Sequence, residues 1–561
     1  MIQRLQFICL ALLITLIPIA SHAASRPNLV LITLDSMRAD RPGFLGGKGG
    51  LTPNLDHLAA ESMIFEHASA QAPTTVLSHA CILTGAYPQS TAITEIGGTL
   101  SLSIPYLPDV LKSNGYRTAA FVGSIELDPQ NGGAQGFDRG FQAYDAGFRP
   151  VVPGDARPPV LVRRADLVAT RATAWLAKNG QGPFFIWIHL DDPSTSAASY
   201  NTSVKAIDAA VGKIIAALKQ QKLDTKTAII AVADHGESLG AHGEDAHGIF
   251  LYDETIHVPL IVKLPDAAQS GKRVTAKVRL VDIAPTVLEI AGVAVPSQMQ
   301  GQSLLRVARS GADQAVYSRT DLPQRGFGWS VLESWRAGKF LYVRAPKPEL
   351  YDLSADPGAT HNLASSSKAT LDTMASTLDR FDKGLSGESK SGTQLSSSEM
   401  QKLASLGYAG LQQNVGPATA VSGTDPKDKI ATANKVAEAE HALQQAKPER
   451  AVATLDPVVS ADGSLYLAQY TLGVALAQQK KYSDALKHLH QAISLHPDSA
   501  WANYEIGATL AKTGDYKTAA VHLEIAAGRL PSFAPAHAAL AEAYDHTGRA
   551  EDAKKQRALA K

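Results

Sequence analysis

Short apolar runs alternate with amphipathic segments from Pro27 to about Ala291. Four runs are rich in Leu and β-branched residues, as expected for strands buried on both faces: Asn28–Leu34, Thr118–Val122, Phe184–His189 and Ala228–Ala233. Stretches with helical spacing lie between them, including Leu51–Ser62, Leu107–Asn114 and Ser203–Gln220. This alternation, sustained over more than 200 residues, predicts a doubly wound α/β domain with a parallel or mixed sheet. Ligands of such sheets bind outside the carboxyl ends of the strands.

A different pattern follows the α/β region. Three short strand-like pieces with turns between them are Val316–Ser318, Phe340–Val343 and Glu349–Asp352. We therefore expect the α/β domain over residues 26–310 and a small antiparallel appendage of the same domain over 311–364. Residues 365–430 are rich in Ser, Gly and Gln, which predicts a linker.

The segment 431–561 repeats with a period of 34 residues. Pairs at this spacing are Gly473 and Gly507, Tyr482 and Tyr516, Ala485 and Ala519, and Pro497 and Pro531. Small residues let two helices pack closely, and Pro ends the second helix. The pattern resembles tetratricopeptide repeats, with three repeats and a shorter terminal one. Such an all-α solenoid is expected to bind a peptide or protein in its concave groove. Self-association and docking on the α/β domain are the alternatives.

The first residues have the features of a secretory signal peptide. Arg4 is positively charged, Phe7–Ala20 is apolar, and Ser21-His22-Ala23 resembles a cleavage site. Because the apolar run is short for a membrane span, we expect removal of residues 1–23 rather than an N-terminal anchor. This predicts an exported protein, periplasmic or secreted. The mature chain would contain one cysteine, Cys81, and therefore no internal disulfide.

The balance of acidic and basic residues limits which kinds of molecule the protein is expected to bind. Lys and Arg together number 53, as do Asp and Glu, so the formal net charge is zero. General nucleic-acid binding would call for a basic excess, and we predict none. Because the net charge is zero, a polyanionic substrate would have to bind at a local site and not through the overall charge of the protein.

Candidate chemistry lies at three predicted element boundaries. Asp35 follows the first strand directly, Thr75 opens a predicted helix, and Asp234 and His235 follow the strand ending at Ala233. Asp and His at strand ends can bind one metal ion, and a helix N-terminus suits an anion. A helix cap at Asp35 or Thr75, or a solvated loop after Ala233, is the structural alternative at each position taken alone.

Taken together, the residues predict one catalytic centre. Asp35, Asp234 and His235 would bind a metal ion, and Thr75 would contact it as the nucleophile. His247 or His242 would protonate the leaving group. His79 and His189 are candidate substrate-binding residues, although a lone His such as His189 is more often structural.

A series of short sequence blocks runs through residues 26–364. It includes Arg26-Pro27-Asn28, Thr52-Pro53-Asn54-Leu55-Asp56, Ser78-His79-Ala80, Leu83-Thr84-Gly85, Asp234-His235-Gly236-Glu237, Leu251-Tyr252-Asp253-Glu254, Val281-Asp282-Ile283-Ala284-Pro285-Thr286 and Glu349-Leu350-Tyr351-Asp352-Leu353. With this series the segment resembles the sulfatase-like branch of the alkaline-phosphatase superfamily. The resemblance implies a doubly wound α/β domain and metal-assisted hydrolysis of a sulfuric or phosphoric ester, with Ca²⁺, Mn²⁺ or Zn²⁺ as the divalent ion. It suggests a small-molecule, glycan or lipid-headgroup ester as the substrate.

Several positions depart from the sulfatase pattern. Sulfatases oxidise a Cys or Ser to formylglycine within Cys-x-Pro-Ser-Arg, where this chain has Thr75, Leu77 and His79. The family's Gly-Lys-Trp-His segment has no counterpart near Gly123-Ser124. Its paired Asp and its His after Asp-Pro are replaced by Ser36 and Ser194. The remaining set looks more like that of threonine-nucleophile relatives, which favours phosphodiester or phosphoryl-transfer chemistry. The alternative is an inactive scaffold that acts in protein binding through its repeats.

Overall fold

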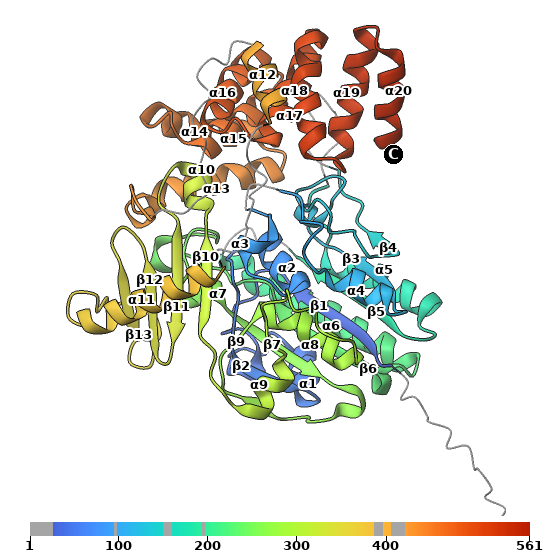
Figure 1. Ribbon diagram of the computed structural model, residues 1–561, viewed down its shortest axis with the longest axis vertical. Helices are drawn as coiled ribbons and strands as arrows, with labels where there is room; N and C mark the ends of the chain where they lie inside the picture. The colour runs from blue at the N-terminus through green and yellow to red at the C-terminus, as the bar shows by residue number, and fades with distance from the viewer. Residues whose placement is uncertain are drawn as a thin grey trace, which may run out of the picture.

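The computed structural model describes residues 26–94, 98–149, 160–192, 197–385, 396–405 and 421–560. The predicted signal peptide and Ser194 lie outside these ranges. Figure 1 shows the α/β domain, the appendage beside it and the helical repeats stacked above both. None of the described helices combines the length and apolarity needed to cross a bilayer.

A mixed sheet forms the centre of the α/β domain. Its strands are β1 (Asn28–Leu34), β2 (Met63–Ser69), β3 (Arg117–Phe121), β4 (Ala143–Asp145), β5 (Phe184–Leu190), β6 (Thr227–Ala233), β7 (His257–Lys263), β8 (Arg273–Val274) and β9 (Val278–Arg279). The order is β4-β3-β5-β1-β6-β7-β2-β8, with β9 paired to β2. Strands β3, β5, β1 and β6 run parallel, whereas β7 is antiparallel to both of its neighbours. The predicted doubly wound mixed sheet is confirmed.

Two groups of helices flank the sheet. One contains α1 (Pro53–Ala60), α5 (Ala165–Asn179) and α6 (Ala197–Gln220), of which α6 contacts both of the others. The other contains α2 (Thr75–Thr84), α4 (Leu107–Ser113) and α8 (Ile283–Ala291). Strands β1, β5 and β6 are buried along their whole length, which explains their uninterrupted apolar sequences.

The antiparallel appendage is larger than the sequence predicts. It has four strands in consecutive order, β10 (Val316–Thr320), β11 (Leu332–Ala337), β12 (Phe340–Arg344) and β13 (Glu349–Asp352). Strand β11 was missed because its sequence, Leu-Glu-Ser-Trp-Arg-Ala, carries a buried Glu and a buried Arg in place of an apolar alternation.

The predicted linker over residues 365–430 is wrong in its first part. Residues Lys368–Leu385 form the helix α11, which contacts β11 and β12. Its Met374 and Leu378 are buried in the core of the appendage, and Arg344 on β12 pairs with Asp379 and Asp382. Ser-rich composition concealed the helical spacing of these apolar positions. A second helix, α12 (Ser397–Ser405), follows.

The repeats form four helix pairs. The first helices of the pairs are α13 (Ile430–Gln444), α15 (Tyr466–Gln478), α17 (Ala500–Thr513) and α19 (Ala534–His546), and the second are α14 (Pro448–Ala461), α16 (Tyr482–Leu495), α18 (Tyr516–Arg529) and α20 (Ala550–Leu559). Each helix packs on its neighbours in the chain. The predicted helical repeat array is thus confirmed.

The array is docked on both the appendage and the α/β domain. Helix α10 (Leu322–Phe327) contacts α15. Asn434 on α13 accepts a hydrogen bond from the Asp245 backbone and donates one to the Gly243 carbonyl, at 3.1 and 2.8 Å. At the other end of the array, Gln135 accepts a bond of 2.9 Å from the backbone of Ser532. The two parts of the chain therefore share an interface.

Candidate active site

Three aspartates follow three adjacent strands of the sheet. Asp35 follows β1, Asp191 follows β5 and Asp234 follows β6. Leu34, at the end of β1, is in register with Leu190 and Ala233, the last residues of the flanking strands. Because these strands are parallel, their carboxyl ends meet at one edge and bring the aspartates together.

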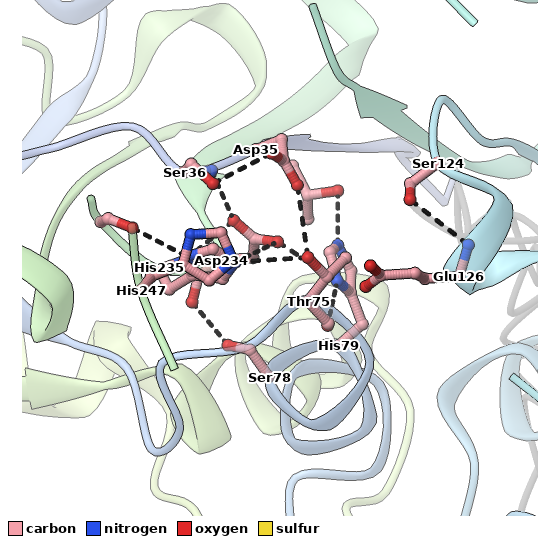
Figure 2. Close-up of polar contacts among 12 residues, drawn as sticks. Asp35, Ser36, Thr75, Ser78, His79, Ser124, Glu126, Asp234, His235 and His247 are labelled. Atoms are coloured by element: carbon pink, nitrogen blue, oxygen red, sulfur yellow. Dashed lines mark hydrogen bonds and ion pairs between the residues drawn. The ribbon is translucent and has the colours of Figure 1, made fainter. Parts of the chain in front are cut away.

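Thr75 approaches this edge from the start of α2. Its Oγ1 lies 3.4 Å from Asp35 Oδ1 and 3.3 Å from His235 Nε2 (Figure 2). The preceding Thr74 has an extended backbone and no capping hydrogen bond from its side chain. The first N–H groups of α2 and the positive end of its dipole are therefore available for an anion next to the hydroxyl.

Backbone and side-chain contacts fix His235 and Asp234. The His235 Nδ1–H donates to the Gly236 carbonyl at 2.8 Å, so its Nε2 presents a lone pair toward Thr75. One oxygen of Asp234 accepts from the backbone of Ser36 and His235, at 3.1 and 2.8 Å. The other, Oδ2, is buried without a hydrogen-bond partner.

Ser36 occupies the position where the sulfatase pattern has a second Asp. Its hydroxyl donates to Asp35 Oδ2 at 3.0 Å, and its backbone binds Asp234. Its φ of 52° places it in the left-handed region, which is uncommon for a residue other than Gly. Ser36 therefore holds two candidate metal ligands in place.

The residues present fit a divalent cation. Asp35, Asp234 and His235 each offer a ligand atom, and these atoms lie within 4.8 Å of one another. Burial, followed by repulsion from Asp35, raises the pKa of Asp234 well above its ordinary value. Burial and then the same repulsion also raise the pKa of Asp191. A cation would offset this crowding of carboxylates and satisfy the unpartnered Asp234 Oδ2.

A second cluster of possible ligands is less suitable. His79, His189 and Asp234 also place ligand atoms within 4.8 Å of one another. However, His79 Nδ1, which faces Asp234, donates to the Thr75 carbonyl at 2.8 Å. A nitrogen that carries this proton cannot bind a metal.

The substrate-binding prediction for His79 is not supported by its surroundings. The ring is fully buried, and its other nitrogen, Nε2, bonds the Thr33 hydroxyl at 2.9 Å. With both nitrogens engaged, His79 has no group free for a substrate. It instead holds the first turn of α2, and with it Thr75, against β1.

The same network sets the tautomer of His189. Because the Thr33 hydroxyl donates to His79, its oxygen accepts from His189 Nδ1, at 3.3 Å, and from Trp187. His189 Nε2 then carries a lone pair, lies 3.7 Å from Asp35 Oδ1 and has no hydrogen-bond partner. His189 thus faces the candidate metal ligands, and it is fully buried behind them.

The two candidate proton donors differ in position. His247 lines the same cavity as Thr75, and its ring centre lies 4.4 Å from that of His235. Its Nδ1 lies 3.2 Å from Glu237 Oε2. Burial opposes protonation, but the charge and hydrogen bond of Glu237 raise the pKa of His247 to about 10. His242 instead stacks on Tyr252, with ring centres 3.7 Å apart.

Sequence reasoning missed two acidic residues at this site. Asp191 carries the same signal as Asp35 and Asp234, an Asp directly after an apolar strand. Glu126 lies in the short helix η2 (Ile125–Leu127), capped by Ser124, and Figure 2 shows its carboxylate pointing toward Thr75. No motif marks Glu126, because only the folded loop brings it to the site.

Comparison with known families assigns the domain. Residues 27–293 match the family model described as Sulfatase. Residues 245–383 match the family model for the C-terminal region of N-sulphoglucosamine sulphohydrolase. The match reaches into α11 and therefore groups this helix with the appendage. Residues 27–293 belong to the sulfatase family. This part of the chain is thus a sulfatase-family hydrolase domain of the alkaline-phosphatase-like superfamily, a class of metal-dependent enzymes. Residues 473–514 match the TPR repeat model.

Individual relatives agree with the family assignment. The ulvan-active sulfatase of Formosa agariphila is 25% identical over 420 residues, covering 63% of this chain and 80% of that protein. The Δ4,5-hexuronate-2-O-sulfatase of Bacteroides thetaiotaomicron is 23% identical and covers 62% and 87%. The crystal structure of a phosphonate monoester hydrolase of Agrobacterium radiobacter has the same fold, with a TM-score of 0.53 at 19% identity, covering 66% of this chain and 99% of that one.

Proposed function

We propose that the chain is an exported hydrolase of phosphoric esters, with Thr75 as the nucleophile and phosphodiesters as the favoured substrates. The observation that carries this proposal is the position of the Thr75 hydroxyl. It lies at a helix N-terminus, within 3.4 Å of Asp35 and His235, two of the three candidate metal ligands. A cation held there would lower the pKa of the hydroxyl and offset charge on the transferred group.

The choice of phosphate over sulfate follows from the chemistry of threonine. A formylglycine hydrate releases sulfate by elimination, and threonine cannot form that hydrate. An ester on Thr75 must instead be broken by a second in-line attack, for which a phosphothreonine intermediate is suitable. The similarity of the fold to that of a phosphonate monoester hydrolase supports this choice.

In the proposed reaction the phosphoryl group passes first to Thr75 and then to water. Thr75 Oγ1 forms a bond to phosphorus as its proton passes to Asp35, and the bond from phosphorus to the leaving oxygen breaks. His247, held by Glu237, gives the leaving oxygen a proton. Water then attacks phosphorus from the opposite side, with its proton passing to His247. The bond to Thr75 breaks, and Thr75 recovers its proton from Asp35.

Export rests on the N-terminal sequence alone. Arg4, the apolar run Phe7–Ala20 and Ser21-His22-Ala23 support a signal peptide removed after Ala23. N-terminal sequencing of the protein recovered from culture medium or periplasm tests this. A mature chain beginning at Ala24 is the expected result.

The nucleophile is tested with purified, metal-loaded protein on an aryl sulfate, a phosphate monoester and a phosphate diester. We expect diester hydrolysis to exceed the other two activities. Thr75→Ala should lower kcat by about 10³-fold or more, while Thr75→Ser retains part of the activity. A phosphoryl group on the peptide containing Thr75, found by mass spectrometry after rapid quenching, would identify the intermediate.

Thr74→Ala is the matched control, because the neighbouring Thr74 hydroxyl has no hydrogen-bond partner. It should leave kcat within a factor of a few. Full activity in Thr75→Ala would exclude Thr75 as the nucleophile. Absence of both turnover and bound metal in the wild type would instead support a non-catalytic scaffold.

A further inference from the structure

A cavity of about 510 Å³ lies between the sulfatase domain and the repeats. Thr75, His247 and Glu126 line it on the side of the sulfatase domain. The opposite wall comes from α13, α15, α17 and the residue before α19, that is, from the first helices of the repeat pairs. The groove of the array therefore opens onto the candidate nucleophile, and its volume is that of a small-molecule site.

Five aromatic side chains dominate the repeat wall: Tyr466, Tyr470, Trp501, Tyr504 and Phe533. Ring contacts join them into two separate groups. Phe533 lies edge-on to both Trp501 and Tyr504, with ring centres 4.9 and 5.0 Å away. Tyr466 and Tyr470 stack at 5.9 Å. Such packing holds the ring faces in fixed positions.

Carboxyl groups outnumber cations around the cavity, where His247 is the one basic side chain among the described lining residues. Glu126, Glu440 and Glu505 line it, whereas neither Lys nor Arg occurs among its described lining residues. Glu505 is 5% exposed, and its Oε2 has no hydrogen-bond partner. The hydroxyl of the adjacent Tyr504 is also buried and unpartnered. A buried, unpaired carboxyl beside aromatic rings calls for a ligand that is a cation or a hydrogen-bond donor.

The acidic groups extend from the metal-ligand cluster to the aromatic wall. Burial and then repulsion from Asp35 raise the pKa of Glu126. Burial and then repulsion from Glu126 raise the pKa of Glu440 to about 7, and burial raises that of Glu505 to about 8. Glu126 is thus close enough to Asp35, and Glu440 to Glu126, for their charges to interact, whereas burial alone shifts the pKa of Glu505.

We propose that the groove of the repeats is the second half of the substrate site and binds an alkylated ammonium group on the leaving alcohol of the ester. This inference rests on the proposed function, which places the ester group at Thr75. Aromatic faces attract such cations by cation–π interaction, most strongly where water is excluded. A bound ammonium group would also lower the raised pKa of Glu505, so that this carboxyl ionises and serves as the counter-charge. A polyanionic chain would instead meet three glutamates, so this cavity is poorly suited to heavily sulfated glycans.

The test measures binding to the full chain without turnover. Choline is the cationic probe, and 3,3-dimethylbutan-1-ol is its neutral isostere, with the same shape and no charge. By titration calorimetry we expect choline to bind at least about tenfold more tightly than the isostere. Glu505→Gln should weaken that preference, because only the cation–π attraction remains, and Glu542→Gln, an exposed acid on α19, should preserve it in full.

Equal affinity for both probes, or no binding of either, would overturn the inference, and so would tighter binding of a sulfated disaccharide than of choline. The comparison in the wild-type chain does not depend on any variant folding. Binding of choline by a protein that hydrolyses no ester would contradict the proposed function and leave the ammonium subsite standing. Hydrolysis of diesters without preference for ammonium-bearing ones, and without choline binding, would remove the subsite alone.

Discussion

At the scale of single residues, the site is organised by which nitrogen or oxygen carries a proton. The Thr33 hydroxyl forms hydrogen bonds with His79 and His189. These bonds leave a lone pair on His189 Nε2, which lies beside Asp35. Likewise, the Gly236 carbonyl orients His235 toward Thr75. Buried backbone and hydroxyl groups thus determine which side chains present lone pairs to a cation.

His247→Gln tests the assignment of the proton donor. We expect the first release of the leaving alcohol to slow about 10²–10⁴-fold for an alkyl diester, whose leaving group needs a proton. For a nitrophenyl diester, whose leaving group departs as an anion, this first release should slow little. Single-turnover measurement of the released alcohol isolates this step from the later attack of water, in which His247 also takes part.

His242→Gln is the control, since His242 stacks on Tyr252 and pairs with Glu254 at 3.8 Å. This substitution should slow the reaction of both substrates only slightly and to the same extent. An equal, large loss on both substrates in His247→Gln would show that His247 does not act on the leaving group.

At the scale of elements, small residues decide how closely the repeat helices approach. A Cβ atom added at Gly473 on α15 would lie 2.6 Å from Leu489 Cγ on α16. At Gly507 on α17 the corresponding distance, to Leu523 on α18, is again 2.6 Å. The 34-residue period therefore corresponds to a repeated close contact between the two helices of a pair.

Gly473→Ala should accordingly destabilise the protein. Overpacking of this kind costs about 1–3 kcal/mol, which exceeds the gain of up to about 1 kcal/mol from better helix propensity. Chemical unfolding followed by circular dichroism measures the change.

Gly528→Ala is the matched control. Gly528 is also helical, on α18, but an added Cβ there meets nothing within 4 Å. This variant should be neutral or slightly more stable. If both substitutions had the same effect, helix propensity rather than close packing would explain it.

At the scale of the whole molecule, the first repeat helices share an apolar core with the sulfatase-family domain, whereas the later ones form a cluster of their own. Buried residues of α13, α14 and α15 belong to the same hydrophobic cluster as the central strands. At the contact between α10 and α15, a Cβ atom added at Gly326 would lie 2.5 Å from Leu467 Cδ1. Glycine thus permits the close approach of the two domains at one wall of the cavity.

Gly326→Ala is therefore expected to loosen this interface. The free energy of unfolding should fall by about 1–3 kcal/mol, and KM should rise for a substrate that fills the cavity. For a small diester that reaches only Thr75, kcat should stay within a factor of two or so. Unfolding curves and kinetics on both substrates provide the measurement.

Gly358→Ala serves as the control, because the nearest atom to its added Cβ is Thr360 Cγ2, at an ordinary 3.6 Å. It should change neither stability nor KM. An unchanged KM in Gly326→Ala, together with lower stability, would show that the domain contact does not shape the cavity.

The sequence by itself determined the α/β domain, the repeats and the set Asp35, Thr75, Asp234 and His235. The signals are local: uninterrupted apolar strands, a fixed helical period and polar residues directly after strands. They can be recognised in the sequence without knowledge of the fold. Helix α11 and strand β11 were missed, because Ser-rich composition and buried charges masked their periodicity.

The tertiary structure decided which residues surround the four predicted site residues. The register of parallel strands brings Asp191 beside Asp35 and Asp234, and buried hydrogen bonds engage both nitrogens of His79. The docking of the repeats places their aromatic groove over Thr75. A local signal marks Asp191 as a strand-end Asp, but none of these arrangements follows from local pattern alone, because each depends on residues far apart in the chain meeting in one buried place.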